Sequence, residues 1–533
     1  MTSSNGTNGN GGGAGAELRD PLLDRTRLRA VHQALTDGDI ATAGKLAEDA
    51  HSDGIDHPMV LNLVAGRREE EGRLDEALAL LQRALAAAPE AIGIMNAIGL
   101  VLYRMDRSAE AVEAYDAALA KEPRFAPALA NRGMARMVLN RTGAARADFE
   151  AAAAIDPGNL VAASKLAVLA LGRGEWAEAR RLAGTVLARE PGYPEAVTVL
   201  ASADLAEGRA AAAEAALADL LADPRLAPAD RANAVRLRGD ALDALGSFAA
   251  AFAAWSEANR LERDQLAPEH EGRPGTLSLV RGLTEVLAGQ RVAAAWGHGG
   301  RSPAKRHVFL VGFPEAGAAL LEQTLSALPD VALLAGREGL IDATREWLAD
   351  TGQFARFCAA DDDALESSRQ AYWRRVREEG VDPAGRLFVD SHRFNIFKLP
   401  LIARLFPDAR VLVAQRDPRD IILACFRRQF PKSGPAWQML TLDGTARLYA
   451  ATMALAEASE TAFGLFTHPV QLEALRADAK GELKAITDFI GVQGALRAPD
   501  LDGEGIGKWR DHAAELEPAM EGLAPLIARF GAA

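Results

Sequence analysis

Cysteine, aromatic residues and long apolar runs are all scarce in this chain of 533 residues. The two cysteines, Cys358 and Cys425, exclude a disulfide framework and a cysteine-rich metal site. No apolar run reaches the roughly 18–20 residues that a membrane-spanning helix requires. The first residues lack the basic and apolar regions of a secretory signal. These absences predict a cytoplasmic protein without a membrane span.

Positive charge is also in deficit. The chain has 60 Lys and Arg against 73 Asp and Glu, a net charge of −13. Nucleic-acid binding needs clustered basic residues, so a general nucleic-acid partner is not expected. The nine histidines show no close ligand spacing, and no metal is predicted. With 49% apolar and 25% charged residues, the composition is that of a globular protein.

The first half of the chain repeats itself every 34 residues. Four prolines keep this step, namely Pro89, Pro123, Pro157 and Pro191. Three further series of residues, which we call tracks, recur at the same step. They are Ala77, Ala111, Ala145, Ala179 and Ala213; Gly99 and Gly133; and Leu81, Tyr115 and Phe149. A small residue on one helix lets the next helix approach, a large residue fills the space beyond, and proline ends the unit. Such helical pairs bury their apolar faces only by stacking into a solenoid.

The period and the small-residue positions resemble the tetratricopeptide repeat family. We place the repeat array at residues 26–263, after a flexible tail at 1–25 and before a linker at 264–305. The resemblance implies that a protein or peptide binds in the groove of the repeats. An alanine-rich helical bundle without true repeats is the alternative.

A different pattern begins near residue 306. Residues 308–311 predict a buried strand, 312–318 a loop of small residues and 319–328 a helix. This order is typical of a phosphate cradle, in which backbone N–H groups and a helix N-terminus face an anion. Gly312 and Gly317 have the required spacing, but the Lys and Ser/Thr that normally follow are absent. Strands at 387–389 and 409–414, with helices at 394–406 and from 415 to 430, extend an α/β domain over residues 306–533.

Four segments together resemble the sulfotransferase family, in the bacterial form fused to tetratricopeptide repeats and related to tyrosylprotein sulfotransferases. They are the loop at 312–319, the QRDPRD sequence at 415–420, VQLEAL at 470–475 and GIGKWRDH at 505–512. The expected fold is an α-helical tetratricopeptide-repeat solenoid followed by an α/β, P-loop-like sulfotransferase domain with a parallel sheet.

The resemblance implies sulfuryl transfer from 3′-phosphoadenosine 5′-phosphosulfate (PAPS) to a hydroxyl of an acceptor that the repeats recruit. It assigns Glu338 as the base. Arg416 would hold the 3′-phosphate, whereas Arg419 and Asp420 are read as structural. The full set of donor-binding residues is Gly312, Pro314, Gly317, Ala318, Ala319, Arg416, Lys508, Trp509 and Arg510.

The chain departs from the family pattern at the donor loop. Glu315 stands where the family has an arginine, and the loop hydroxyls are replaced by alanines. Ala424 takes the place of the serine that follows Arg416, and Ser391 that of a lysine. Two other interpretations therefore stay open. The domain is a sulfotransferase-fold pseudoenzyme that acts as a protein-interaction scaffold, or its loop accepts a less charged ligand.

Overall fold

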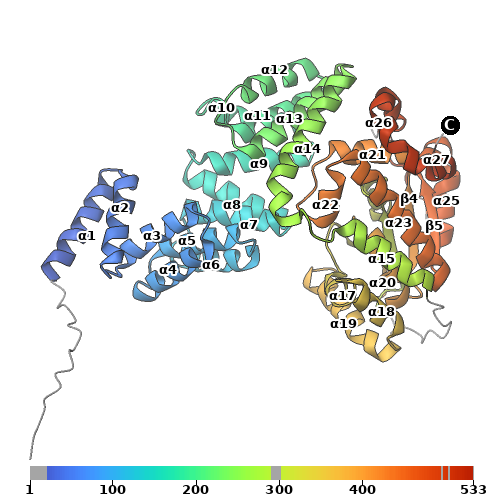
Figure 1. Cartoon of the computed structure of the whole chain (residues 1–533), viewed down its shortest axis with the longest axis horizontal. Helices are drawn as coiled ribbons and strands as arrows, with labels where there is room; N and C mark the ends of the chain where they lie inside the picture. Colours follow the sequence, from blue (N-terminus) through green and yellow to red (C-terminus); the bar gives the residue numbers. More distant parts are fainter. Residues whose placement is uncertain (1–20, 290–301, 494–495, 502–504, 532–533) are drawn as a thin grey trace, which may run out of the picture. The chain divides into compact units, whose positions relative to one another are not determined.

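The computed structural model describes residues 21–289, 302–493, 496–501 and 505–531 (Figure 1). The chain divides into two compact units, Met1–Ala203 and Asp204–Ala533. The described part of the first unit is helical, whereas the second joins helices α12 to α14 to an α/β domain. Most of the predicted tail at 1–25 lies outside the described residues. The domain limits given above, 26–263, 264–305 and 306–533, stay a prediction.

The first unit is a series of antiparallel helical pairs, as the 34-residue period predicts. Its helices are α1 (Pro21–Thr36), α2 (Ile40–Ser52), α3 (Pro58–Glu70), α4 (Leu74–Ala87), α5 (Ile92–Arg104), α6 (Ser108–Lys121), α7 (Ala126–Val138), α8 (Thr142–Ile155), α9 (Leu160–Gly172), α10 (Trp176–Leu187) and α11 (Pro194–Ala206).

The glycine track explains how closely the paired helices pack. A Cβ at Gly99 would lie 2.5 Å from the Tyr115 ring, and a Cβ at Gly133 would lie 2.7 Å from the Phe149 ring. Both rings are buried, as are the five alanines of the repeat. In these two repeats the glycine track and the large-residue track therefore follow one packing rule, in which the large side chain covers a residue without a side chain.

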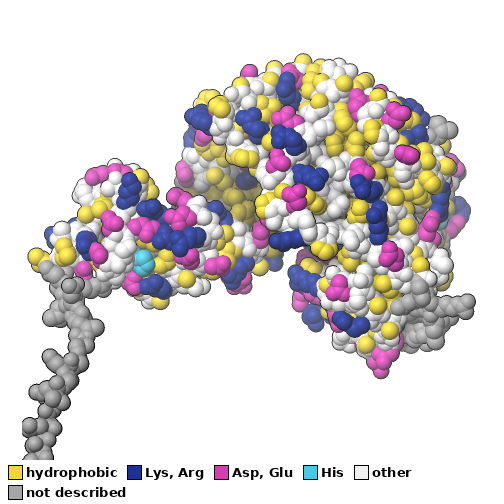
Figure 2. Space-filling model, in the orientation of Figure 1, with side chains coloured by type: hydrophobic (Ala, Val, Ile, Leu, Met, Phe, Trp, Pro, Cys, Tyr) yellow, Lys and Arg dark blue, Asp and Glu magenta, His cyan; other side chains and the backbone are white. Residues whose placement is uncertain are grey.

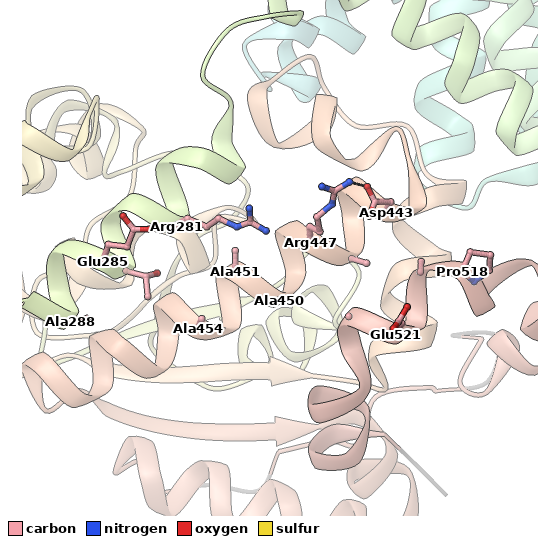
Figure 3. A pocket seen from close by; sticks show the side chains of 14 residues that line it. Arg281, Glu285, Ala288, Asp443, Arg447, Ala450, Ala451, Ala454, Pro518 and Glu521 are labelled. Atoms are coloured by element: carbon pink, nitrogen blue, oxygen red, sulfur yellow. Dashed lines mark ion pairs between the residues drawn. The ribbon is translucent and has the colours of Figure 1, made fainter.

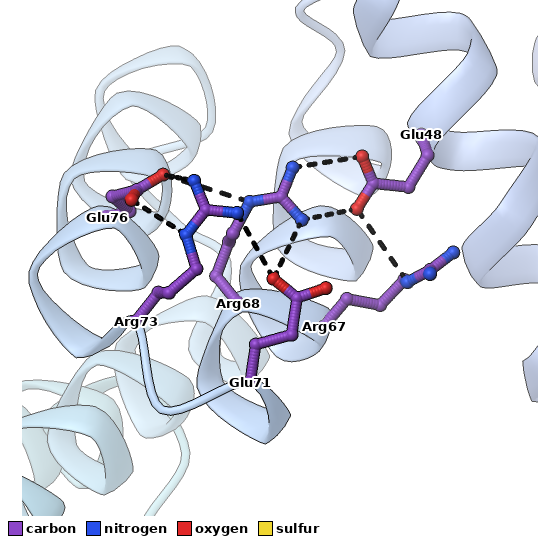
Figure 4. Close-up of polar contacts among 6 residues, drawn as sticks. All are labelled: Glu48, Arg67, Arg68, Glu71, Arg73 and Glu76. Atoms are coloured by element: carbon purple, nitrogen blue, oxygen red, sulfur yellow. Dashed lines mark hydrogen bonds and ion pairs between the residues drawn. The ribbon is translucent and has the colours of Figure 1, made fainter.

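Charged side chains link the outer faces of neighbouring helices in this unit (Figure 4). Arg68 donates to Glu48 on the preceding helix at 2.6 Å, and Arg73 donates to Glu76 at 2.8 Å. Arg68 is partly buried, whereas Arg73 is exposed. Exposed pairs of this kind contribute about 0–1 kcal/mol each, so they orient the helices more than they stabilise them.

The last helical pair is longer than the others. The second unit begins with α12 (Ala210–Leu221), α13 (Pro228–Ala244), α14 (Phe248–His270) and α15 (Thr276–Gly289). Helix α13 has 17 residues where α11 has 13, and the additional turn precedes Gly239. Gly239 packs against Trp255 as Gly99 does against Tyr115. Much of the stretch expected as a linker is helical, because α14 continues through Pro268 and α15 follows it.

The second unit contains a five-stranded, fully parallel sheet in the order β2-β3-β1-β4-β5. Its strands are β1 (Arg306–Gly312), β2 (Val331–Leu334), β3 (Leu387–Asp390), β4 (Arg410–Gln415) and β5 (Phe466–Gln471). In the central strand β1 every residue after Arg306 is buried. A strand that helices cover on both faces has a nearly continuous apolar sequence, because both faces are buried. This pattern is the one that predicted β1.

Helices and short 3-10 turns connect and cover the strands. They are α16 (Ala318–Ser326), α17 (Ile341–Trp347), α18 (Thr351–Ala359), α19 (Asp362–Glu378), η1 (Asn395–Lys398), α20 (Leu399–Leu405), α21 (Pro418–Arg427), α22 (Gly434–Met439), α23 (Leu442–Phe463), α24 (Leu472–Ala477), α25 (Ala479–Ile490), η2 (Lys508–His512), α26 (Ala513–Met520), η3 (Glu521–Leu523) and α27 (Ala524–Phe530).

Two helix predictions need correction. The stretch 394–406 is a 3-10 turn followed by a short α-helix, since Pro400 favours a helix start at that point. The helix after residue 415 ends at Arg427 and not at Phe430, because Arg428 is extended. Within the described ranges, no helix combines the length and apolar character that a membrane span requires.

Candidate functional site

The carboxyl ends of the parallel strands meet at one edge of the sheet. The chain runs from β3, on one side of β1, to β4 on the other side, so the strand order reverses at β1. Ligands of open α/β sheets bind in the crevice at such a reversal. The loop after β1, the end of β3 at Asp390 and the end of β4 at Gln415 all face this crevice.

The loop after β1 is held tightly by its neighbours. A Cβ at Gly312 would lie 3.0 Å from the Ala414 carbonyl oxygen, so a side chain there would crowd β4. Gly317 has a φ of +96°, and the buried Leu472 side chain occupies the place of a Cβ there. The Cys425 thiol donates to the Pro314 carbonyl at 3.2 Å. Burial raises the pKa of Cys425, which keeps this thiol protonated.

The same loop leaves several backbone donors without a protein acceptor. Ala316 donates to the Phe313 carbonyl, and Leu320 donates to Gly317. In the described part of the chain, no acceptor receives the N–H groups of residues 315, 317, 318 and 319. Unshared N–H groups at a loop and a helix N-terminus form the common arrangement for an anion. The loop and helix predicted from sequence are therefore present and leave these N–H groups available, although the usual polar side chains are missing.

Glu315 places a carboxylate in this loop. It has a φ of +65°, a region that L-residues other than Asn and Asp seldom adopt. Its carboxylate forms an ion pair with Arg428 at 3.2 Å, and the Arg428 side chain is 64% exposed. Arg428 and its neighbour Arg427 are therefore both paired with carboxylates of the chain itself.

Arg416 is buried beside the turn at 505–509. Its guanidinium donates to the Gly505 carbonyl at 2.6 Å and lies 3.7 Å from the Asp420 carboxylate. Asp420 accepts the backbone N–H groups of Gly507 at 2.6 Å and of Trp509 at 2.9 Å. Burial raises the pKa of Asp420, although these two hydrogen bonds oppose that shift. Asp420 therefore has the structural contacts expected of it, joining α21 to the turn that carries Trp509.

Trp509 lies between two guanidinium groups. Arg419 is 3.5 Å and Arg510 is 4.8 Å from the ring centroid. Its Nε1 is buried and has no hydrogen-bond partner in the described ranges. Lys508 points elsewhere, since its ammonium lies 2.9 Å from Asp511 and 3.3 Å from Asp243 of α13.

The basic side chains around the loop and the turn are balanced by acids. Five cations, Arg416, Arg419, Arg427, Arg428 and Lys508, are paired with six carboxylates, namely Glu315, Asp417, Asp420, Asp240, Asp243 and Asp511. Arg510, beside the Trp509 ring, is a sixth cation of this region. An anion entering this region meets paired charges and must rely on backbone donors or displace a carboxylate.

Glu338 lies in a second cluster, beyond the ends of β2 and β3. It forms an ion pair with Lys398, whose side chain is 7% exposed. His392 is close enough for both charges to act on it, and burial together with Lys398 lowers the pKa of His392 to about 4. Its Nδ1 is buried without a hydrogen-bond partner in the described part of the chain. Sequence reasoning missed Lys398 and His392, although His392 lies only three residues after the end of a predicted strand.

A buried polar chain lies behind this cluster. His307 Nε2 is 3.1 Å from the Tyr372 hydroxyl, which donates to Asp390 at 2.9 Å. Asn395 donates to the other oxygen of Asp390 at 2.7 Å. Burial raises the pKa of Asp390 to about 6 and lowers that of His307 to about 3. The network fixes the end of β3, from which Ser391 and His392 project.

Comparison with known families agrees with this arrangement. Residues 307–495 match the model of the sulfotransferase family, and residues 96–159 and 170–234 match two models of the tetratricopeptide repeat. The chain combines tetratricopeptide repeats with a sulfotransferase-family domain. A protein of Aquifex aeolicus (strain VF5), described as uncharacterized, is 24% identical over 233 residues. That match covers 40% of this chain but only 28% of the relative's length.

Solved structures similar to this chain include several repeat proteins. A tetratricopeptide repeat protein from Parabacteroides merdae ATCC 43184 is 20% identical, covers 45% of this chain and 93% of its own, and has a TM-score of 0.36. A thermophilic TPR protein of Thermus thermophilus is 24% identical, covers 34% of this chain and 99% of its own, and has a TM-score of 0.30.

The family implies PAPS as donor, and the residues of the sulfotransferase-family domain fit it in part. The unshared N–H groups of the loop and the unpartnered Trp509 Nε1 suit phosphate or sulfate oxygens. The Glu315 carboxylate and the paired state of Arg416 do not. The domain therefore provides backbone donors for an anion, but less positive side-chain charge than the family pattern has.

The domain also has a groove away from this loop. It has a volume of about 830 Å³ and lies between α15, α23 and the α26–η3 segment (Figure 3). Its floor consists of alanines of α23, and Arg281 and Arg447 stand at its rim. None of the predicted donor residues lines it. On the molecular face shown in Figure 2, basic and acidic side chains are interspersed, with no large area of one sign.

Proposed function

We propose that this protein transfers a sulfuryl group from PAPS to a hydroxyl of a protein or peptide acceptor. The observation that carries the proposal is the set of unshared N–H groups at residues 315 and 317–319, located where the strand order reverses. The match of residues 307–495 to the sulfotransferase family supports the same interpretation.

The remaining groups have roles that follow from their positions. When bound, PAPS supplies a sulfur atom that bonds to the acceptor oxygen as its bond to the phosphate breaks and 3′-phosphoadenosine 5′-phosphate (PAP) leaves. Glu338 takes the proton of the acceptor hydroxyl, and Lys398 orients the Glu338 carboxylate. Arg416 contributes positive charge at the nucleotide end, and Trp509 Nε1 is a further donor.

The repeats supply the acceptor in this proposal. Tetratricopeptide repeats imply protein binding, and two stretches of this chain match their models. A protein or peptide held by the repeats would present its hydroxyl at high local concentration, which compensates for a weakly recognised acceptor side chain. The cytoplasmic location expected from sequence suits such a protein acceptor.

A scaffold without turnover is the second candidate. The pairing of five cations of this region with carboxylates of the chain, and Glu315 in the loop itself, favour it, because PAPS is strongly anionic. In that case the α/β domain would serve as a folded partner of the repeats.

Titration with PAP, the stable product, separates the two candidates. We expect micromolar binding by calorimetry at low salt, and a loss of about 10- to 100-fold in Arg416→Ala, since a hydrogen bond to a charged group contributes about 1.5–3 kcal/mol. Arg447→Ala, at the rim of the distant groove, is the matched control and should bind as the wild type does. Absence of binding up to millimolar PAP would exclude the transferase and leave the scaffold.

Replacing Glu338 tests the base. Glu338→Gln should lower PAP release from PAPS by about 100-fold or more in the presence of hydroxyl-bearing peptides, because general-base catalysis contributes about 10²–10⁴-fold. PAP affinity should stay unchanged, since Glu338 contacts Lys398 and not the loop. Glu285→Gln serves as control. Equal turnover in wild type and Glu338→Gln would assign the proton transfer to another group, with His392 the first to test.

A further inference from the structure

The last helical pair, α13–α14, is built into the sulfotransferase-family domain. Ala251 and Trp255 of α14 belong to the same apolar core as the sheet. Phe252 stacks on Phe426 of α21 at 5.1 Å. Arg427, at the end of α21, lies over the Trp255 ring at 4.6 Å. The pair therefore touches the helix that begins two residues after Arg416.

Polar side chains of the pair also complete the end of α21. Asn259 donates to the Phe426 carbonyl at 3.0 Å, and Arg236 lies 3.3 Å from the Arg427 carbonyl. Arg236 in turn holds Asn259 at 2.9 Å and Glu262 at 2.6 Å. The last carbonyls of a helix have no partner within the helix. Here α13 and α14 provide those partners.

Asp243 is the centre of this interface. Its carboxylate lies 2.9 Å from His512 Nε2, 3.3 Å from the Lys508 ammonium and 3.4 Å from the Arg427 guanidinium. Burial opposes its ionisation, but the hydrogen bond from His512 and the two cations together lower the pKa of Asp243 below its ordinary value. His512 is itself fully buried. One carboxylate of α13 thus joins the end of α21 to η2.

These two segments also hold Arg416. Asp420 of α21 accepts the N–H groups of Gly507 and Trp509, and Arg416 donates to the Gly505 carbonyl. A shift of η2 relative to α21 would change these three contacts together. The path from Asp243 to Arg416 consists of hydrogen bonds and ion pairs that join α13, α21 and η2.

We propose that Asp243 is a positioning residue for the anion site at Arg416, so that the α13–α14 pair controls the affinity of the domain for PAP. The claim that this pair controls PAP affinity rests on the proposed function. A partner that displaces this last helical pair would weaken donor binding, which connects the repeat side of the chain to the reaction.

The test compares full-length wild type, Asp243→Asn and the control Asp219→Asn, which changes an exposed aspartate of α12. Hydrogen exchange is measured at the Gly507 and Trp509 amides. We expect at least tenfold faster exchange at both amides in Asp243→Asn, with no change in Asp219→Asn or in the α16 amides of either variant. PAP affinity by calorimetry should fall about tenfold in Asp243→Asn.

The two readouts separate this inference from the proposed function. If wild type binds no PAP, the transferase fails, and the exchange data alone decide whether Asp243 orders η2. Unchanged exchange at Gly507 and Trp509 overturns the inference, and so does unchanged PAP affinity in a wild type that binds. If Asp243→Asn does not fold, Lys508→Met removes one partner of the same carboxylate, and its exchange at the two amides must rise.

Discussion

The domain that contains the sheet should lose stability in mild acid because of one buried imidazole. His307 is fully buried against aromatic rings, and burial lowers its pKa to about 3 from an ordinary 6.5. The Tyr372 hydroxyl donates to Asp390, so it accepts from His307 Nε2, and Nδ1 has no partner among the described residues. A second proton on His307 would therefore be buried without an acceptor.

The sign of the pH dependence follows from the protons bound in each state. Between pH 6 and 4 the unfolded chain protonates His307 and His392, whose folded pKa values are about 3 and about 4. The folded state instead holds a proton on Asp390, whose folded pKa is about 6. The unfolded state binds more protons by 2 − 1 = 1 from these groups. The free energy of unfolding should then fall by about 1.4 kcal/mol for each unit of pH lowered.

The variant His307→Phe isolates this contribution. Phenylalanine suits the aromatic surroundings of this position. Without His307, the proton that His392 gains on unfolding nearly cancels the proton that Asp390 loses. We measure urea unfolding at pH 6, 5 and 4 through the β1 and β3 amides. The free energy of unfolding of the wild type should fall by about 1.4 kcal/mol more than that of the variant for each unit of pH lowered. Parallel pH profiles for the two proteins would mean that His307 is protonated in the folded state.

Local patterns in the sequence were sufficient for much of the fold. The 34-residue tracks predicted which residues pack in the repeats, because Gly99 and Tyr115 are neighbours within one helical pair. The strand β1 was recognisable because both of its faces are buried. By contrast, the short strand β2 and helices α17 and α18 were not anticipated.

The candidate site could be predicted only in part, because its decisive contacts join distant positions. Lys398 meets Glu338 across 60 residues, and Asp243 meets His512 across 269. Such pairs leave no periodicity in a single sequence. The loop was predicted from Gly312 and Gly317, yet its electrostatics depend on Arg428, which reaches Glu315 from just beyond the end of α21. The roles of the predicted site residues remain proposals that the variants described here address.

Removing the charge of Glu315 should strengthen PAP binding more than any other single change in the loop. Its carboxylate belongs to the loop whose N–H groups would face the phosphates, and it also neutralises Arg428. A like charge near a bound phosphate costs about 1–3 kcal/mol at a partly exposed site, so Glu315→Gln should bind PAP about 10- to 100-fold more tightly. Calorimetry at low salt measures the change directly.

Glu315→Gly distinguishes charge from backbone strain. Glu315 has a φ of +65°, which glycine adopts without cost, so this variant should gain about 1 kcal/mol in the free energy of unfolding. Glu315→Gln keeps the strain and should show no such gain, while both variants should bind PAP more tightly. If neither substitution changes PAP affinity in a wild type that binds, the carboxylate does not face the phosphates. If both variants also fail to bind at millimolar PAP, then the missing loop hydroxyls and the paired state of Arg416, and not this one charge, keep the donor out.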